Sequence, residues 1–124
     1  MNEEDFRNGQ VLLIDKPLNW TSFQVVNKIR WLIKNKFAIK KIKVGHAGTL
    51  DPLATGIVVI CTGKKTKTID QLINESKQYI GEIRLGSTTP SFDLETKIDN
   101  EFPIPKLDES VLKQISENFL GELN

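Results

Sequence analysis

The segment VGHAGTLDPLATG, residues 44–56, brings together side chains that could carry out chemistry. It contains the chain's only histidine, His46, and an aspartate, Asp51, that is followed directly by Pro52. A proline ring holds the preceding residue in extended backbone, so the Asp51 carboxylate is expected on a stiff piece of chain. The glycines of the segment would let a bulky substrate approach closely. Such a carboxylate could act as a nucleophile or as a base.

The same spacing also fits an ordinary turn, in which Asp51 accepts backbone N–H bonds. Other catalytic chemistries find less support. A zinc site would need ligands that one histidine and one cysteine cannot supply. A Ser–His–Asp triad is disfavoured because His46 and Asp51 are near neighbours and no GxSxG motif exists. Nucleotide hydrolysis loses its main support because the loop has no GK[ST] sequence. We therefore expect no metal site.

The net charge of +1 conceals a segregation of charge along the chain. Between Lys16 and Arg84 there are 13 basic and 4 acidic residues, whereas residues 93–124 contain 3 basic and 8 acidic residues. The densest basic stretch is KIRWLIKNKFAIKKIK, residues 28–43. It could be a solvated helix face or a surface that binds a polyanion. The nearby KKTK at 64–67 favours contacts with phosphate.

The bulk composition limits the class of protein. A chain of 124 residues with 39% hydrophobic residues can build one modest core. No apolar run is long enough to cross a bilayer, and the first ten residues are acidic rather than basic, so we expect a cytoplasmic protein. The single cysteine, Cys61, cannot form an internal disulfide and is expected to be a small buried residue.

The elements that must position the loop can be read from local patterns. The apolar runs on either side of it, residues 42–44 and 56–63, predict two core strands. Thr21 with Gln24 has the spacing of a capping box at the start of a helix of about four turns. That helix should expose Lys28, Arg30 and Lys34. The other predicted elements are a strand at 11–15, a short helix at 66–75 with Ile69, Leu72 and Ile73 inward, a strand at 77–86, a long excursion at 87–105, and a helix capped by Asp108 that ends near Gly121. The expected fold class is α+β, a mixed, mainly antiparallel sheet with packed helices.

Three motifs in this sequence resemble those of the TruB-type tRNA pseudouridine synthases. VGHAGTLDPLATGIVVICTGKKTK resembles that family's G-H-x-G-x-L-D-P-x-A-x-G loop, with its following strand and G-x-x-T-K turn. LLIDKPLNWTSFQVVNKIR resembles the family's opening DKPxGxTS segment and helix. KQYIGEIRLGSTTPSFD resembles its K-x-Y strand and the T-x-[ST]-x-D loop. The motifs occur in the family's order over residues 11–97.

The resemblance implies a function and roles for particular residues. The family isomerises a uridine in the T-loop of tRNA, position 55, to pseudouridine without cofactor or metal. It implies that Asp51 is the nucleophile toward a flipped-out base, at the sugar or the uracil ring. Tyr79 would stack on the target base, and His46 would contact RNA near the flipped nucleotide. Candidate RNA phosphate contacts are Lys16, Lys64 and Lys67. The implied partner is the T-arm stem-loop of tRNA, without membrane, and the full-length protein is expected to be a monomer.

The chain departs from the family pattern in two ways. Asn19 replaces a usual glycine, and Pro90 and Thr96 replace an acidic residue and a glycine in the T-x-[ST]-x-D loop. Family members also continue well past residue 124, with the rest of the sheet, an arginine that pairs with the aspartate, and often a C-terminal RNA-binding domain. The resemblance therefore implies that residues 1–124 are the N-terminal portion of a catalytic domain, inactive in isolation.

Two other functions remain open on the sequence. In one, the chain is a non-catalytic RNA-binding module whose basic segments grip a stem-loop while Asp51 only forms a turn. In the other, it is a scaffold stabilised by a partner, with no role in RNA binding; charge reversal at Lys40, Lys41 and Lys43 would then leave RNA affinity unchanged.

Overall fold

The computed structural model describes residues 1–121. The chain divides into two compact units, Met1–Tyr79 and a second unit that begins at Ile80. The first unit contains the loop with Asp51. Each unit is an α+β arrangement whose strand pairs are antiparallel, so the expected fold class is confirmed.

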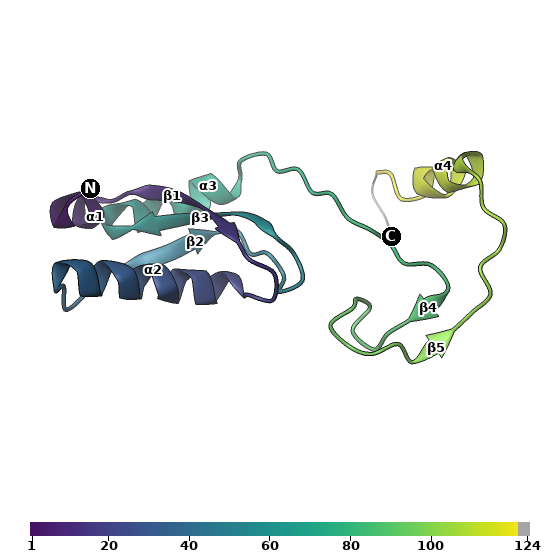
Figure 1. Ribbon diagram of the computed structural model, residues 1–124. Helices are drawn as coiled ribbons and strands as arrows, with labels where there is room; N and C mark the ends of the chain where they lie inside the picture. Colours follow the sequence, from purple (N-terminus) through teal and green to yellow (C-terminus); the bar gives the residue numbers. More distant parts are fainter. Residues whose placement is uncertain (122–124) are drawn as a thin grey trace. The chain divides into compact units, whose positions relative to one another are not determined.

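The first unit is built on a three-stranded sheet with the order β1-β3-β2 (Figure 1). The strands are β1 (Val11–Lys16), β2 (Val44–Ala47) and β3 (Gly56–Thr62). The central strand β3 is the β-branched run IVVI, whose residues Val58 and Ile60 are buried. The predicted strands at 11–15 and 56–63 are therefore confirmed, and the one expected at 42–44 begins two residues later.

The long helix α2 (Ser22–Phe37) packs along one face of this sheet (Figure 1). It begins at the expected capping box, in which Gln24 N–H donates to Thr21 Oγ1 and Thr21 N–H donates to the Gln24 side chain. Lys28 and Lys34 are exposed as predicted, whereas Arg30 is half-buried and donates to the Val44 carbonyl at 3.0 Å. The core between helix and sheet consists of Phe6, Val25, Val26, Ile33, Ile39, Ile42, Val44, Val58 and Ile60.

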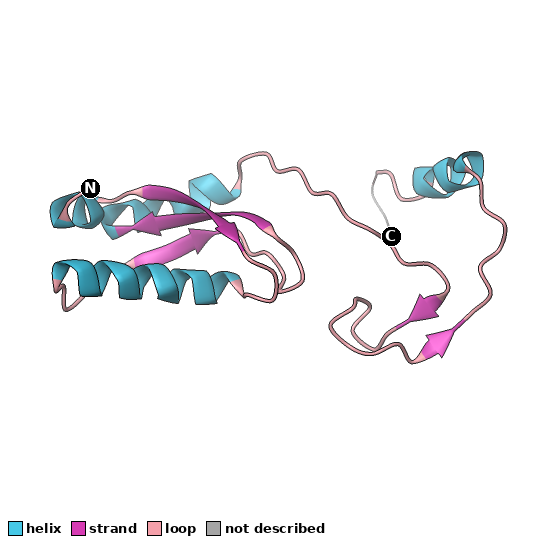
Figure 2. Cartoon of the chain, in the orientation of Figure 1, coloured by secondary structure: helices cyan, strands magenta, loops and turns pink. Residues whose placement is uncertain are grey.

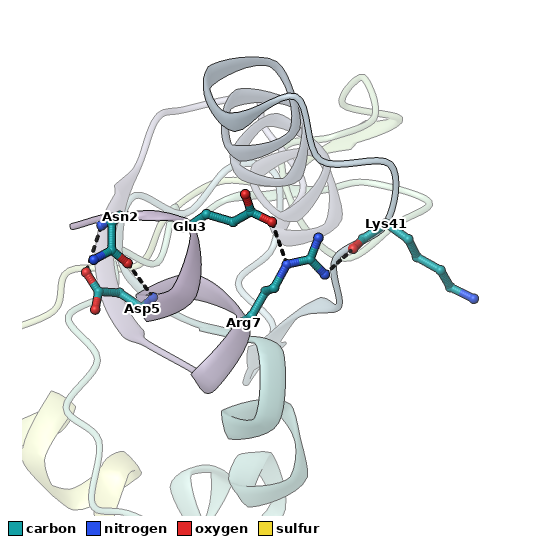
Figure 3. Close-up of polar contacts among 5 residues, drawn as sticks. All are labelled: Asn2, Glu3, Asp5, Arg7 and Lys41. Carbon is teal, nitrogen blue, oxygen red and sulfur yellow. Dashed lines mark hydrogen bonds and ion pairs between the residues drawn. The ribbon is translucent and has the colours of Figure 1, made fainter.

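Three short helices complete the first unit. The first, α1 (Glu3–Asn8), was not expected from the sequence; Asn2 and Asp5 form a capping box at its start (Figure 3). After β3 come the 3₁₀ helix η1 (Gly63–Thr68) and α3 (Ile69–Ile73), which together replace the single helix predicted at 66–75. Ile69 and Leu72 are half-buried, but Ile73 is exposed, so its predicted inward position is wrong.

Residues 77–86 do not form the predicted strand. The chain from Ser76 to Leu85 has no regular secondary structure (Figure 2). Ile80 and Ile83 are almost fully exposed. An alternating pattern becomes a strand only where another strand supplies ladder hydrogen bonds. No segment within residues 1–121 pairs with this one.

The second unit contains the remaining elements. A two-stranded ladder, β4 (Ser87–Thr88) with β5 (Asn100–Glu101), closes the loop of residues 89–99, and α4 (Glu109–Glu117) follows. Asp108 caps α4 as expected, since its side chain accepts from Val111 N–H at 3.0 Å. The helix ends at Glu117, before the predicted stop at Gly121. Over the described residues, no helix has the length and apolarity needed to cross a membrane.

Cys61 is fully buried in β3, as predicted, and burial raises the pKa of its thiol above the usual range. Because the thiolate is the reactive form, we expect Ellman's reagent to label native Cys61 at pH 8 at least about 100-fold more slowly than the urea-unfolded chain. Equal labelling rates would contradict the buried position.

The raised pKa of Cys61 also means that ionisation of its thiol favours the unfolded state, so the free energy of unfolding should decline as pH rises beyond the ordinary thiol pKa.

Candidate active site

The segment with Asp51 forms the connection between β2 and β3, at one end of the three-stranded sheet (Figure 1). The turn between β1 and α2, residues 17–21, lies at the same end, because hydrogen bonds join the two segments. The connection is thus held against a neighbouring turn rather than extending freely into solvent.

Ser22 fastens the residue before Asp51. Its hydroxyl accepts a hydrogen bond from Leu50 N–H at 2.9 Å and donates to the Leu50 carbonyl at 3.2 Å. The hydroxyl can do both because a serine oxygen has one proton and free lone pairs. Ser22 is buried in the first turn of α2. It lies inside the TS motif, but its partner 28 residues away could not be inferred from local spacing.

The residue after Asp51 is fastened by two donors. Asn19 N–H donates to the Pro52 carbonyl at 2.8 Å, and Lys16 Nζ donates to the same oxygen at 3.3 Å. Asn19 adopts φ 63°, the left-handed region that glycine and asparagine tolerate best. Asparagine can therefore occupy this position, where the family usually has glycine, without disturbing the turn.

Lys16 has a role different from the one expected. Its side chain has no exposed surface, and its ammonium donates to the carbonyls of Pro17 at 3.1 Å, Trp20 at 2.6 Å and Pro52 at 3.3 Å. A lysine ammonium has three N–H donors, and the three carbonyl acceptors engage all of them. The structure gives no support to the expected contact between Lys16 and an RNA phosphate, because the side chain is enclosed and its ammonium is engaged by these carbonyls. Instead, it links β1 and the turn to the loop.

The Asp51 carboxylate is exposed between these two anchors. The Asp51 carbonyl accepts from Ala54 N–H at 3.0 Å, which closes a turn over residues 51–54. Within residues 1–121 no hydrogen bond or ion pair engages the carboxylate itself, so the alternative in which it accepts backbone N–H bonds does not describe this turn. The backbone on both sides is held while the acidic group remains open to a ligand.

His46 lies on β2 opposite Ile60, and its ring is half-buried. Its Nδ1 lies 2.7 Å from the Gly48 carbonyl. A carbonyl oxygen can only accept, so Nδ1 carries the proton and donates, which leaves Nε2 as the acceptor in the neutral ring. The ring thereby helps to hold Gly48, whose φ of 99° is itself in the region that favours glycine.

Tyr79 is not hydrogen-bonded to the loop in the described chain. Its side chain is 69% exposed, and within the described chain no hydrogen bond joins it to residues 44–56. Lys77, two residues earlier, does lie near the loop, since its Cε is 3.7 Å from the point where a Cβ on Gly48 would be. The structure thus places one member of the K-x-Y pair beside the loop and leaves the tyrosine in solvent.

Lys64 and Lys67 are exposed and lie at the other end of the sheet from Asp51, in η1. They line a cavity of about 310 Å³. The first 121 residues hold no group of three or more His, Cys, Asp or Glu side chains arranged to bind a metal ion.

The Ser22 anchor gives a direct test of the loop geometry. We expect Ser22→Ala to lower the free energy of unfolding by about 1–2 kcal/mol, because both polar groups of Leu50 lose their partner in a half-buried position. Urea unfolding of the full chain measures this. Thr55→Ala is the matched control, since it removes an exposed hydroxyl from the same loop. Equal effects of the two changes would show that the anchor contributes nothing.

Comparison with known proteins connects this site to one family. The model of the TruB family pseudouridylate synthase N-terminal domain matches residues 34–124. A tRNA pseudouridine synthase B of Flavobacterium johnsoniae is 54% identical over 125 residues, which is 100% of this chain and 55% of the relative. Its counterpart in Phocaeicola vulgatus is 53% identical over 96% of this chain and 51% of the relative.

A more distant relative, the tRNA pseudouridine synthase B of Chlorobaculum tepidum, is 49% identical over 92% of this chain and 47% of its own length. The chain therefore spans about half the length of the curated relatives it matches. The family-model match covers most of the chain and includes the whole loop around Asp51. With a loop of the expected sequence held at one end of an antiparallel sheet, this chain belongs to the TruB family of pseudouridylate synthases.

Proposed function

We propose that the protein containing this chain converts a uridine in the T-loop of tRNA, position 55, to pseudouridine. The single observation that carries this proposal is the Asp51 carboxylate, which is exposed and unengaged among the described residues while both neighbouring residues are anchored. The relatives, which are named tRNA pseudouridine synthase B, support the reaction and the tRNA substrate. A cytoplasmic location and a monomeric full-length protein are part of the same proposal.

The reaction is an isomerisation, so its atoms balance within the nucleotide. The bond between C1′ of the ribose and N1 of uracil breaks, and a bond between C1′ and C5 forms. The C5 proton leaves and N1 ends with a proton, so neither a redox reagent nor a cofactor is required. We propose that Asp51 forms a transient bond at C1′ or at the ring and is released when the new bond forms.

The anchored loop explains how the carboxylate could meet one atom of an extruded base. Flipping a nucleotide costs a few kcal/mol, which contacts with the RNA must offset. A nucleophile held within a narrow range of positions avoids further loss of entropy in the transition state. In this proposal His46 contacts RNA beside the flipped nucleotide and Tyr79 stacks on the base, which would require the segment around Tyr79 to approach the loop.

We further propose that residues 1–124 form the N-terminal portion of the catalytic domain and that this portion alone has little activity. The apolar residues left exposed on the sheet and in the irregular segment, including Leu13, Ile57, Ile80 and Ile83, support a need for further packing.

The alternative is an RNA-binding module without catalysis. Tritium release from T-arm RNA labelled at uridine C5 separates the two, with the full-length protein tested as wild type and as Asp51→Asn. Equal release by both proteins would contradict the proposed function. A binding module would show no release from either protein and an RNA affinity that falls steeply with salt.

A further inference from the structure

A second cluster of charge lies at the end of the sheet remote from Asp51. Five basic residues, Arg7, Lys41, Lys43, Lys64 and Lys67, line the cavity of about 310 Å³ together with Ile42, Gly63 and Thr66. They come from α1, from the segment between α2 and β2, and from η1. The resemblance to the family implied Lys64 and Lys67 as phosphate contacts, and Lys41 and Lys43 belong to the basic run noted in the sequence. The structure adds Arg7 and brings the three segments together.

The lysines at 41 and 43 are directed outward by the strand-like alternation of their segment. Ile42 and Val44 are buried in the core, while Lys41 and Lys43 are exposed. Four lysines of the basic run at 28–43 therefore fall into two groups. Lys28 and Lys34 lie on the exposed face of α2, and Lys41 and Lys43 lie on the cavity.

The backbone that carries these lysines is held by both neighbouring elements. Gly63 N–H donates to the Lys43 carbonyl at 2.9 Å, and Arg7 contacts the Lys41 carbonyl at 3.5 Å (Figure 3). Figure 3 also shows the Lys41 side chain extending away from the pair formed by Arg7 and Glu3. The basic groups are thus presented from a fixed framework rather than from a loose loop.

Acidic side chains neutralise little of the positive charge around the cavity. Glu3 pairs with Arg7 at 2.7 Å, and no other ion pair exists over residues 1–121. Lys64 Nζ donates to the neutral Asn8 side chain at 3.1 Å. Several positive charges around one cavity repel each other and attract a polyanion.

We propose that this cavity, lined by Arg7, Lys41, Lys43, Lys64 and Lys67, binds the phosphodiester backbone of the RNA substrate at a second position, remote from the reacting base. The inference rests on the proposed function, which supplies an RNA partner. The strand β3 runs from the Asp51 loop to the cavity, and its seven residues span about 20 Å. The cavity is therefore too far from Asp51 to bind the phosphate of the reacting nucleotide. It would bind the backbone of nucleotides elsewhere in the same RNA.

The test measures RNA affinity of the full-length protein as a function of salt. In Lys41→Ala/Lys43→Ala we expect the slope of log K against log salt to fall by about 1.5, and the Kd for tRNA near physiological salt to rise roughly tenfold. The single-turnover rate at saturating RNA should not change, because Asp51 is remote. Lys28→Ala/Lys34→Ala, the matched control, should retain the wild-type slope and Kd.

Two results would overturn the inference. One is a salt slope in Lys41→Ala/Lys43→Ala equal to that of the wild type or of the control variant. The other is unchanged RNA affinity with lost binding to vesicles containing phosphatidylserine, which would make the occupant a membrane surface. Failure of the proposed function is a separate result, since it appears as isomerisation that survives Asp51→Asn, whatever the salt slope.

Discussion

Replacing Asp51 with asparagine is expected to lower the rate of uridine isomerisation by at least about 10⁴-fold, the order of loss seen when a covalent nucleophile is removed. The amide has nearly the shape of the carboxylate but cannot form the transient bond. The loop should stay in place, because Ser22, Lys16 and Asn19 hold its backbone and no described residue depends on the carboxylate itself. Single-turnover tritium release at saturating RNA measures the effect.

Asp70→Asn is the control for this experiment, since Asp70 is an exposed aspartate on α3, outside the loop. We expect it to retain wild-type activity. The Kd of Asp51→Asn for T-arm RNA should remain within about threefold of the wild type, because phosphate contacts dominate affinity. A variant that binds RNA normally and still isomerises it would exclude Asp51 as the nucleophile.

Replacing Lys16 with methionine should affect both stability and catalysis. Methionine keeps most of the buried stem but donates no hydrogen bond, so the carbonyls of Pro17 and Trp20 lose a partner and that of Pro52 keeps only Asn19. Loss of these bonds should reduce the free energy of unfolding by about 2–4 kcal/mol. The measurement is urea unfolding of the full-length protein.

The catalytic effect of Lys16→Met follows from the loop. Without the hydrogen bond from Lys16 to the Pro52 carbonyl, the position of the Asp51 carboxylate is less restricted. A displacement of about 1 Å can lower the rate on the order of 100-fold. We expect kcat to fall while KM changes little, since the Lys16 side chain has no exposed surface with which to bind RNA. A raised KM with unchanged kcat would instead indicate a phosphate contact.

Two further variants make the Lys16 result specific. Lys34→Met removes an exposed lysine from α2 and should leave stability and kcat unchanged. Lys16→Arg keeps the charge and the donors but must fit a planar group into a space without exposed surface, so we expect partial recovery of kcat relative to Lys16→Met. Equal losses in Lys34→Met and Lys16→Met would show that the position of the buried ammonium is unimportant.

The failures of prediction have a common physical cause. Tyr79, Ile83 and Leu85 alternate as a strand would, yet the segment is irregular, because alternation describes a surface that fits a sheet and does not supply the neighbouring strand. Lys16 appeared to be one more basic group available for phosphate. Its burial depends on carbonyls of Trp20 and Pro52, which local pattern does not bring near it.

The sequence by itself determined the local features of this protein. Pro52 restricts Asp51, the capping box of Thr21 begins α2, and two β-branched or apolar runs place the loop between core strands, since each of these effects acts over a few residues. Only the tertiary structure decided which groups meet. Ser22 reaches Leu50 over 28 residues, Lys16 reaches Pro52 over 36, and Arg7 gathers with Lys41 and Lys64 around one cavity. These contacts arise because burial of the core brings together segments that are distant in the sequence. They cannot be predicted from the spacing of residues along the chain.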